Sequence, residues 1–224
     1  HAFDLYSELR GVLKQLEVPH GQLPELDADL EAMKIAGVDP ASIEMSYHLR
    51  IPEEGASIFS NLKKMGPFPV GPSVAFIDPS DGGDFTAMSI IRAYGEGVAV
   101  KGKLWKKAWY HALDDIVEIL KSHNVQQLFF EINATGRQPI GQLREALSEA
   151  GIGVVAVFSQ SNKHSTILAA GNIAHMIHLS SDSDAAYSKQ VIRYEYGADH
   201  DDAPDSLARC LEKLGLIRGK EKEK

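Results

Sequence analysis

Acidic residues stand at three places in the 224-residue chain where neighbouring carboxylates could bind cations. Asp78 ends one short apolar run, and Glu131 follows another. Asp202 and Asp205 are three residues apart near the start of an expected helix, so they share one helix face. Grouped carboxylates repel and raise one another's pKa unless a cation lies among them. These residue types therefore predict a site for a hard divalent cation, Mg²⁺ or Mn²⁺.

The chemistry available to such a site is hydrolysis of a phosphodiester bond. Two divalent ions held about 3.5–4 Å apart can activate a water molecule and stabilise the leaving oxygen. Two ions would also roughly balance the charge of four carboxylates. Asp84 adds a fifth, because the turn at Gly82 and Gly83 can return it toward Asp78. The residue types alone therefore indicate nuclease chemistry with two metal ions.

Each of these acids, taken alone, also has a purely structural interpretation. Asp202 and Asp205 could complement the dipole of their helix, an interaction worth about 0.3–1 kcal/mol each. Asp81 stands beside a Gly-Gly pair and is interpreted as a turn residue rather than a ligand. The hypothesis of a shared site rests on the coincidence of Asp78, Glu131 and the helical pair at matching ends of their elements.

The elements that would position these acids belong to an α/β fold. Residues 73–104 have the pattern of three strands with hairpin-length connections, and apolar strands at 128–132 and 152–158 then alternate with helices. Crossover connections favour parallel pairing, which predicts a mixed sheet of five or more strands in βββαβαβα order, flanked by helices. Parallel neighbours would carry Asp78 and Glu131 to the same edge of the sheet. Helices are expected near 109–123, 138–150, 163–174, 183–194 and 203–214.

The first 72 residues differ in pattern from the rest of the chain. Helical spacing of apolar residues within 2–36 predicts a small helical appendage, and prolines and glycines between 52 and 72 predict an extended linker. Residues 73–218 are expected to form the main domain. The charged residues 219–224 are expected to be a disordered tail.

The net charge of −8 argues at first against a nucleic-acid partner. Eight carboxylates in the three acidic stretches account for this excess, and the remaining acids balance the 23 basic residues. The single cysteine, Cys210, excludes an internal disulfide and is interpreted as a buried small side chain. Because nothing suggests an oxidising compartment, we expect an intracellular protein. No apolar run approaches the roughly 18 residues of a membrane span, so we expect no membrane partner.

Several basic residues are candidates for contacts with DNA phosphates. The lysines between 101 and 107 could form a phosphate-binding patch, or could instead protect a solvated edge strand. Lys163 could contact a phosphate, or could instead be a solvated residue at the start of a helix. His175 and His178 are interpreted as core or surface residues rather than zinc ligands, because no other soft ligands accompany them. The DNA-binding candidates are Lys101, Lys103, Lys106, Lys107, Arg137 and Lys163.

Three motifs together resemble a known family. They are FIDPSDGGDFTA at 76–87, FEINATG at 130–136 and HDDAPDSLA at 200–208. In this order they resemble the nuclease domain of the large terminase subunit, the DNA-packaging motor of tailed bacteriophages and herpesviruses. The resemblance covers about residues 73–214. It implies an RNase H-like fold, shared with Holliday-junction resolvases, and cleavage of double-stranded concatemeric viral DNA with little sequence specificity.

The resemblance also implies roles for individual residues. Asp78 would bridge both metal ions, and Glu131 would ligate one of them. The last helix would supply a ligand through Asp205, with Asp202 three residues before it. Which of Asp201, Asp202 and Asp205 bind metal stays open. Asp84 matches an additional acid that some members of the family carry.

One departure from the family concerns ATP. Complete large terminases carry a packaging ATPase, whereas this chain has no G-x-x-x-x-G-K-[ST] phosphate loop, so we expect a carboxy-terminal portion without ATP hydrolysis. The implied partners are double-stranded DNA, an ATPase domain of the same polypeptide, the small terminase subunit and the portal, in the host cytoplasm. The alternatives are a cellular resolvase or RNase H relative, and a catalytically silent RNase H-like module that docks DNA.

Overall fold

The computed structural model of the chain describes residues 57–132, 140–158, 162–195, 198 and 200–217. The expected helical appendage, Arg137 and the charged tail lie outside the described residues. Within the described ranges, no helix is both long enough and apolar enough to cross a bilayer.

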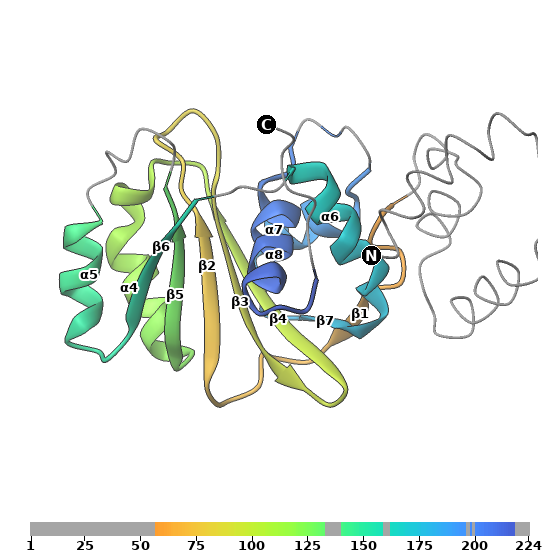
Figure 1. Cartoon of the computed structure of the whole chain (residues 1–224), viewed down its shortest axis with the longest axis horizontal. Helices are drawn as coiled ribbons and strands as arrows, with labels where there is room; N and C mark the ends of the chain where they lie inside the picture. Colours follow the sequence, from red (N-terminus) through yellow and green to blue (C-terminus); the bar gives the residue numbers. More distant parts are fainter. Residues whose placement is uncertain (1–56, 133–139, 159–161, 196–197, 199, 218–224) are drawn as a thin grey trace, which may run out of the picture.

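The described strands form one mixed sheet in the order β1-β7-β4-β3-β2-β5-β6 (Figure 1). β3 runs antiparallel to both of its neighbours, and all the other pairs are parallel. Every strand except β3 therefore ends at the same edge, and β3 begins there. The strands are β1 (Lys63–Met65), β2 (Ser73–Asp78), β3 (Thr86–Tyr94), β4 (Gly97–Trp105), β5 (Val125–Glu131), β6 (Gly153–Val157) and β7 (Ile177–Ser180).

Helices cover both faces of the sheet (Figure 1). Side chains alternate along β2, so that Phe76 packs with the helices of one face and Ile77 with those of the other. One face carries η1 (Trp109–Ala112), α4 (Leu113–Ser122) and α5 (Gly141–Ser148). The other carries α6 (Lys163–Asn172), η2 (Ala174–Met176), α7 (Ala185–Ile192) and α8 (Asp202–Lys213). The prediction of a mixed sheet flanked by helices is confirmed.

Two strands were not expected from the sequence. β7 has four residues and β1 has three, which is too short for a period-two pattern to stand out. β7 pairs with Val98–Val100, and the carbonyl of Gly102 accepts a hydrogen bond from the amide of Asp184 (2.9 Å). The interpretation of 98–104 as a lysine-protected edge strand is therefore wrong. The main fold also begins before residue 73, because Ile58 and Phe59 are buried in its core.

A buried chain of hydroxyl groups joins α7 and α8 to the middle of the sheet. Ser89 Oγ on β3 lies 2.6 Å from Tyr187 Oη and 3.0 Å from Ser206 Oγ. The Tyr187 ring lies directly over Gly102 of β4, where a Cβ atom would overlap it. The absence of a side chain at Gly102 thus sets how closely α7 approaches the sheet.

We predict that Gly102→Ala destabilises the fold by about 1–3 kcal/mol, because the methyl group must displace the Tyr187 ring from a fully packed core. Chemical denaturation followed by circular dichroism measures this change. Gly141→Ala is the matched control, since a Cβ atom there meets nothing within 4 Å, and its effect should be neutral or slightly stabilising. Equal effects of the two substitutions would contradict the packing argument.

Candidate metal centre

Two of the predicted acids leave the sheet side by side. β2 and β5 are parallel neighbours, and Ile77 pairs with Phe130. Asp78 and Glu131, the next residue on each strand, therefore lie at the shared carboxyl edge and on the same face of the sheet. The expected adjacency of these two carboxylates is observed.

α8 brings two further carboxylates over this edge. The helix packs on β2 and β3, and its first turn holds Asp202 and Asp205, each only 5% exposed. The amide of Ala203 in the same turn donates a hydrogen bond to Gln190 Oε1 of α7 (3.0 Å). The start of α8 is thus fixed by α7, and the helix dipole favours negative charge at this end.

The inner carboxylates are close enough to interact strongly. Burial raises the pKa of Asp78 well above its ordinary value, and the charges of Asp205 and Glu131 raise it further. Burial also raises the pKa of Asp205 to about 6, against the opposing effect of nearby cations. Asp78, Glu131 and Asp205 therefore form one electrostatic unit, which we call the inner acids.

Two cations of the chain lie against the inner acids. Lys163 Nζ lies 2.8 Å from Asp201 Oδ1 and 3.4 Å from Asp205 Oδ2. Burial by itself lowers the pKa of Lys163, but Asp205, Asp201 and Asp78 more than offset this and raise it above its usual range. The buried Arg209, one helical turn after Asp205, places Nε 3.3 Å from its Oδ1. The positive charges of Lys163 and Arg209 thus offset part of the repulsion among the inner acids.

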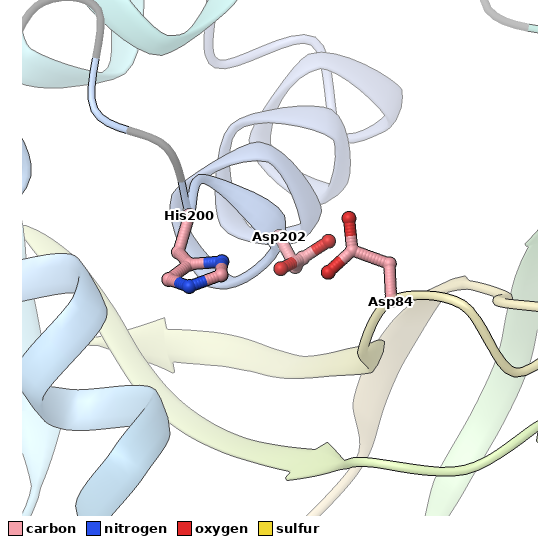
Figure 2. A group of neighbouring side chains, drawn as sticks. All are labelled: Asp84, His200 and Asp202. Carbon is pink, nitrogen blue, oxygen red and sulfur yellow. The ribbon is translucent and has the colours of Figure 1, made fainter.

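A second group lies farther out, where Asp84, Asp202 and His200 converge (Figure 2). Each offers a ligand atom, and these atoms all lie within 4.8 Å of one another. Burial raises the pKa of Asp202 to about 6, and the charge of Asp84 adds to the rise. These three residues are called the outer group below.

The β2–β3 loop presents Asp84 to the outer group. Ser80 Oγ accepts hydrogen bonds from the amides of Gly82 (3.0 Å) and Asp84 (3.1 Å), and Gly82 adopts a positive φ of 113°. The Ser80 amide donates to Thr86 Oγ1 (3.1 Å) at the start of β3. The loop is therefore held by one serine. The sequence predicted that its Gly-Gly turn returns Asp84 toward Asp78, and the structure places Asp84 beside Asp202 and His200.

His200 was missed by sequence reasoning. It stands two residues before Asp202 in the third acidic motif, and its ring packs edge-on against Phe85 at 6.0 Å. A search of that motif for every residue type that can bind a metal, rather than for carboxylates alone, would have found it. Its imidazole gives the outer group a nitrogen ligand, which suits Mn²⁺ or Zn²⁺ better than Mg²⁺.

The donor atoms fit a divalent cation. Among the described residues, Glu131 Oε2 and Asp202 Oδ2 are buried side-chain oxygens that have no hydrogen-bond partner. Buried polar atoms are normally satisfied, so such oxygens imply a ligand. Carboxylate oxygens are the atoms that Mg²⁺ and Mn²⁺ prefer, and both the inner acids and the outer group supply them.

The predicted DNA-binding lysines separate into two sets. Lys101 and Lys103 lie on the face of β4 opposite α8, in ion pairs with Asp182 (2.6 Å) and Asp115 (2.7 Å) respectively. Their position and pairing do not support the expected phosphate contact. The exposed Lys106 and Lys107 follow the end of β4, at the sheet edge where the acids gather.

Comparison with known proteins identifies the fold. No protein-family profile matches the chain, and no curated protein matches its sequence. The large terminase nuclease of the thermophilic phage G20c, solved with bound zinc, matches with a TM-score of 0.51 and 13% identity, over 70% of this chain and 96% of that chain. The fold is RNase H-like. The sequence resemblance to the terminase nuclease domain is thereby supported at the level of structure.

Two other solved structures also match this chain. The large terminase of bacteriophage HK97 matches with a TM-score of 0.50 and 11% identity, over 87% of this chain and 52% of that chain. Thermus thermophilus RuvC matches with a TM-score of 0.38 and 16% identity, over 66% of this chain and 99% of that chain.

We predict that Asp202→Asn stabilises the chain by about 1 kcal/mol at pH 7 in EDTA. The pKa of Asp202 is raised in the folded state, so the folded chain holds this proton more tightly than the unfolded chain. Stability therefore falls as pH rises from about 4 to 6, and the gain from Asn should vanish below about pH 4. Denaturant titrations at several pH values measure it, with the exposed Asp114→Asn of α4 as control. A destabilised Asp202→Asn variant at pH 7 would contradict this account.

We predict that His200→Ala weakens Mn²⁺ binding about tenfold or more and weakens Mg²⁺ binding much less, because the imidazole is the ligand that favours transition metals. Isothermal calorimetry with each metal measures the two affinities. His178→Ala on β7 is the control, since that ring packs against Tyr94 away from the outer group. An equal loss of affinity for Mn²⁺ and Mg²⁺ would show that His200 does not set a preference for Mn²⁺ over Mg²⁺.

Proposed function

We propose that the chain is a metal-dependent DNA endonuclease. One observation carries this proposal: five carboxylates from four elements meet at one sheet edge, where buried carboxylate oxygens have no hydrogen-bond partner among the residues that the structure describes. These carboxylates come from the ends of β2 and β5, the β2–β3 loop and the first turn of α8. A site so rich in negative charge repels a phosphodiester unless cations lie between them, and metal-assisted hydrolysis is the chemistry that such a site serves.

The carboxylates divide between two proposed ion positions, an inner one and an outer one. Besides burial, the charges of Asp205, Glu131 and Asp202 raise the pKa of Asp78, so this inner acid also interacts with a member of the outer group. The inner position would use Asp78, Glu131 and Asp205, and the outer position would use Asp84, Asp202 and His200. Divalent ions there would act as Lewis acids that activate a water molecule and offset the charge developing on the phosphate.

The chain's own cations have a positioning role in this proposal. Arg209 also donates to Thr166 Oγ1 (3.2 Å) on α6, so it holds Asp205 between two helices. Lys163, at the start of α6, contacts the other oxygen of the same carboxylate, Oδ2. Asp205 is thus held in one orientation before any ligand arrives, which lowers the reorganisation needed for catalysis.

We extend the proposal to the biological role that the sequence motifs imply. The substrate would be double-stranded concatemeric viral DNA, cut during genome packaging with little sequence specificity. Support comes from the shared fold of the G20c nuclease and from the HK97 large terminase, of which this chain covers about half. A packaging ATPase of the same polypeptide, the small terminase subunit and the portal would be the partners, and the host cytoplasm the location.

We predict that the parent chain nicks and linearises supercoiled plasmid with Mg²⁺ or Mn²⁺ but not with EDTA. Asp78→Asn and Glu131→Gln should each lower the rate at least about 100-fold, because each removes a proposed metal ligand while keeping side-chain volume. Gel assays measure the rates, and circular dichroism verifies folding. Asp114→Asn, an exposed acid of α4, is the matched control and should retain full activity.

The same assay separates the alternatives. Full cleavage by both site variants would refute the assigned carboxylates. An inactive parent that also binds no Mn²⁺ in calorimetry would refute the metal centre and favour a silent DNA-docking module. Preferential cleavage of a four-way junction over linear duplex would favour a resolvase.

A further inference from the structure

A cleft of about 560 Å³ begins at the outer group and runs along α7. Asp84 and His200 line it at the end next to the metal centre. Lys106, Lys189 and Arg193 line the rest of its charged surface. Three cations thus face one carboxylate in this cleft, although the whole chain has a net charge of −8. We call these three residues with their surroundings the basic cleft.

One face of α7 forms a wall of the basic cleft. Ala186, Lys189, Gln190 and Arg193 follow the spacing of a single helix face, and the intervening Tyr187 points into the core. Lys189 and Arg193 are four residues apart, so their like charges repel along the helix. Both are exposed, and neither forms an ion pair within the described part of the chain. Unpaired cations placed together in a cleft favour an anionic ligand.

Another part of the cleft lining is grouped around the Phe85 ring. Lys106 Nζ lies 6.0 Å from the centre of the Phe85 ring, and the His200 ring packs edge-on against the same ring. Phe85 directly follows Asp84 in the β2–β3 loop. One side chain therefore positions a cation of the cleft and a ligand of the outer group together.

The basic cleft and the metal centre are also joined through α8. Gln190, on the cleft wall, accepts the hydrogen bond from the Ala203 amide in the turn that carries Asp202 and Asp205. The position of the α7 wall relative to the carboxylates is thus fixed by a direct contact. A ligand that spans both would meet a preformed surface.

We propose that the basic cleft binds the sugar-phosphate backbone of the DNA strand next to the bond that is cut. The inference rests on the proposed function and adds to it the path of the strand, from the carboxylates along α7. Lys106, Lys189 and Arg193 contact successive phosphates, and this contact does not depend on base sequence. Binding energy from these phosphates holds the scissile bond over the metal centre.

The test is the salt dependence of DNA binding. Fluorescence anisotropy of a labelled duplex is measured in Mg²⁺ with the full chain carrying Asp78→Asn, so that cleavage does not interfere. Adding Lys189→Ala and Arg193→Ala should weaken binding and reduce the slope of log Kd against log salt by about 1.8, roughly 0.9 for each lost phosphate contact. Lys64→Ala with Lys121→Ala is the matched control, because both lysines are exposed on β1 and α4, away from the cleft. The control pair should leave the slope unchanged.

The outcomes distinguish this inference from the proposed function. An unchanged affinity and slope after loss of Lys189 and Arg193 would overturn the cleft as the strand path, even if the parent cleaves plasmid. Displacement of the duplex by dAMP as readily as by unlabelled duplex would show a mononucleotide pocket and would also overturn it. A parent that cleaves no DNA with either metal refutes the proposed function itself.

Discussion

Repulsion among buried carboxylates is the constraint around which this structure is organised. Asp78, Glu131 and Asp205 are gathered at one sheet edge, and burial and mutual charge raise the pKa of Asp78 and of Asp205. Such a group lowers the free energy of unfolding at neutral pH, so the rest of the fold must hold it together. Lys163 and Arg209 offset part of this repulsion through ion pairs with Asp205. The packing of the core beneath α8 contributes the remaining stabilisation that holds the acids together.

The fold meets this constraint through its middle strands. β2 and β3 lie at the centre of the sheet, where their hydrogen bonds are protected on both sides, and α8 packs directly on them. Hydroxyl contacts of Ser89 with Tyr187 and Ser206 fix α7 and α8 to β3. Hydrogen bonds are directional, so they specify the positions of the two helices more narrowly than nonpolar packing alone. The acids are thus mounted on the part of the molecule that is hardest to deform.

Sequence reasoning reached the parts that follow from local pattern. The apolar runs ending in Asp78 and Glu131, with crossover connections between strands, sufficed to place both acids at one edge of a mixed sheet. β1, β7 and the burial of Ile58 depend on tertiary pairing with elements far along the chain, which short runs do not encode. The convergence of His200 on Asp84 and the opposite orientation of Lys101 and Lys103 likewise arise only when loops and strands are placed in space.

The β2–β3 loop has an evolutionary consequence. The inner acids are tied to strands and to a core helix, whereas Asp84 lies on a loop whose shape is set mainly by the hydroxyl of Ser80. Losing the position of an inner acid therefore requires a change in the sheet or the core helix, whereas Asp84 can move through a change in the loop alone. Related chains can change the affinity or the chemical preference of the outer position by altering a few loop residues while the sheet stays intact. The metal centre thus combines inner acids that are built into the fold with a loop acid that can be changed without altering the fold.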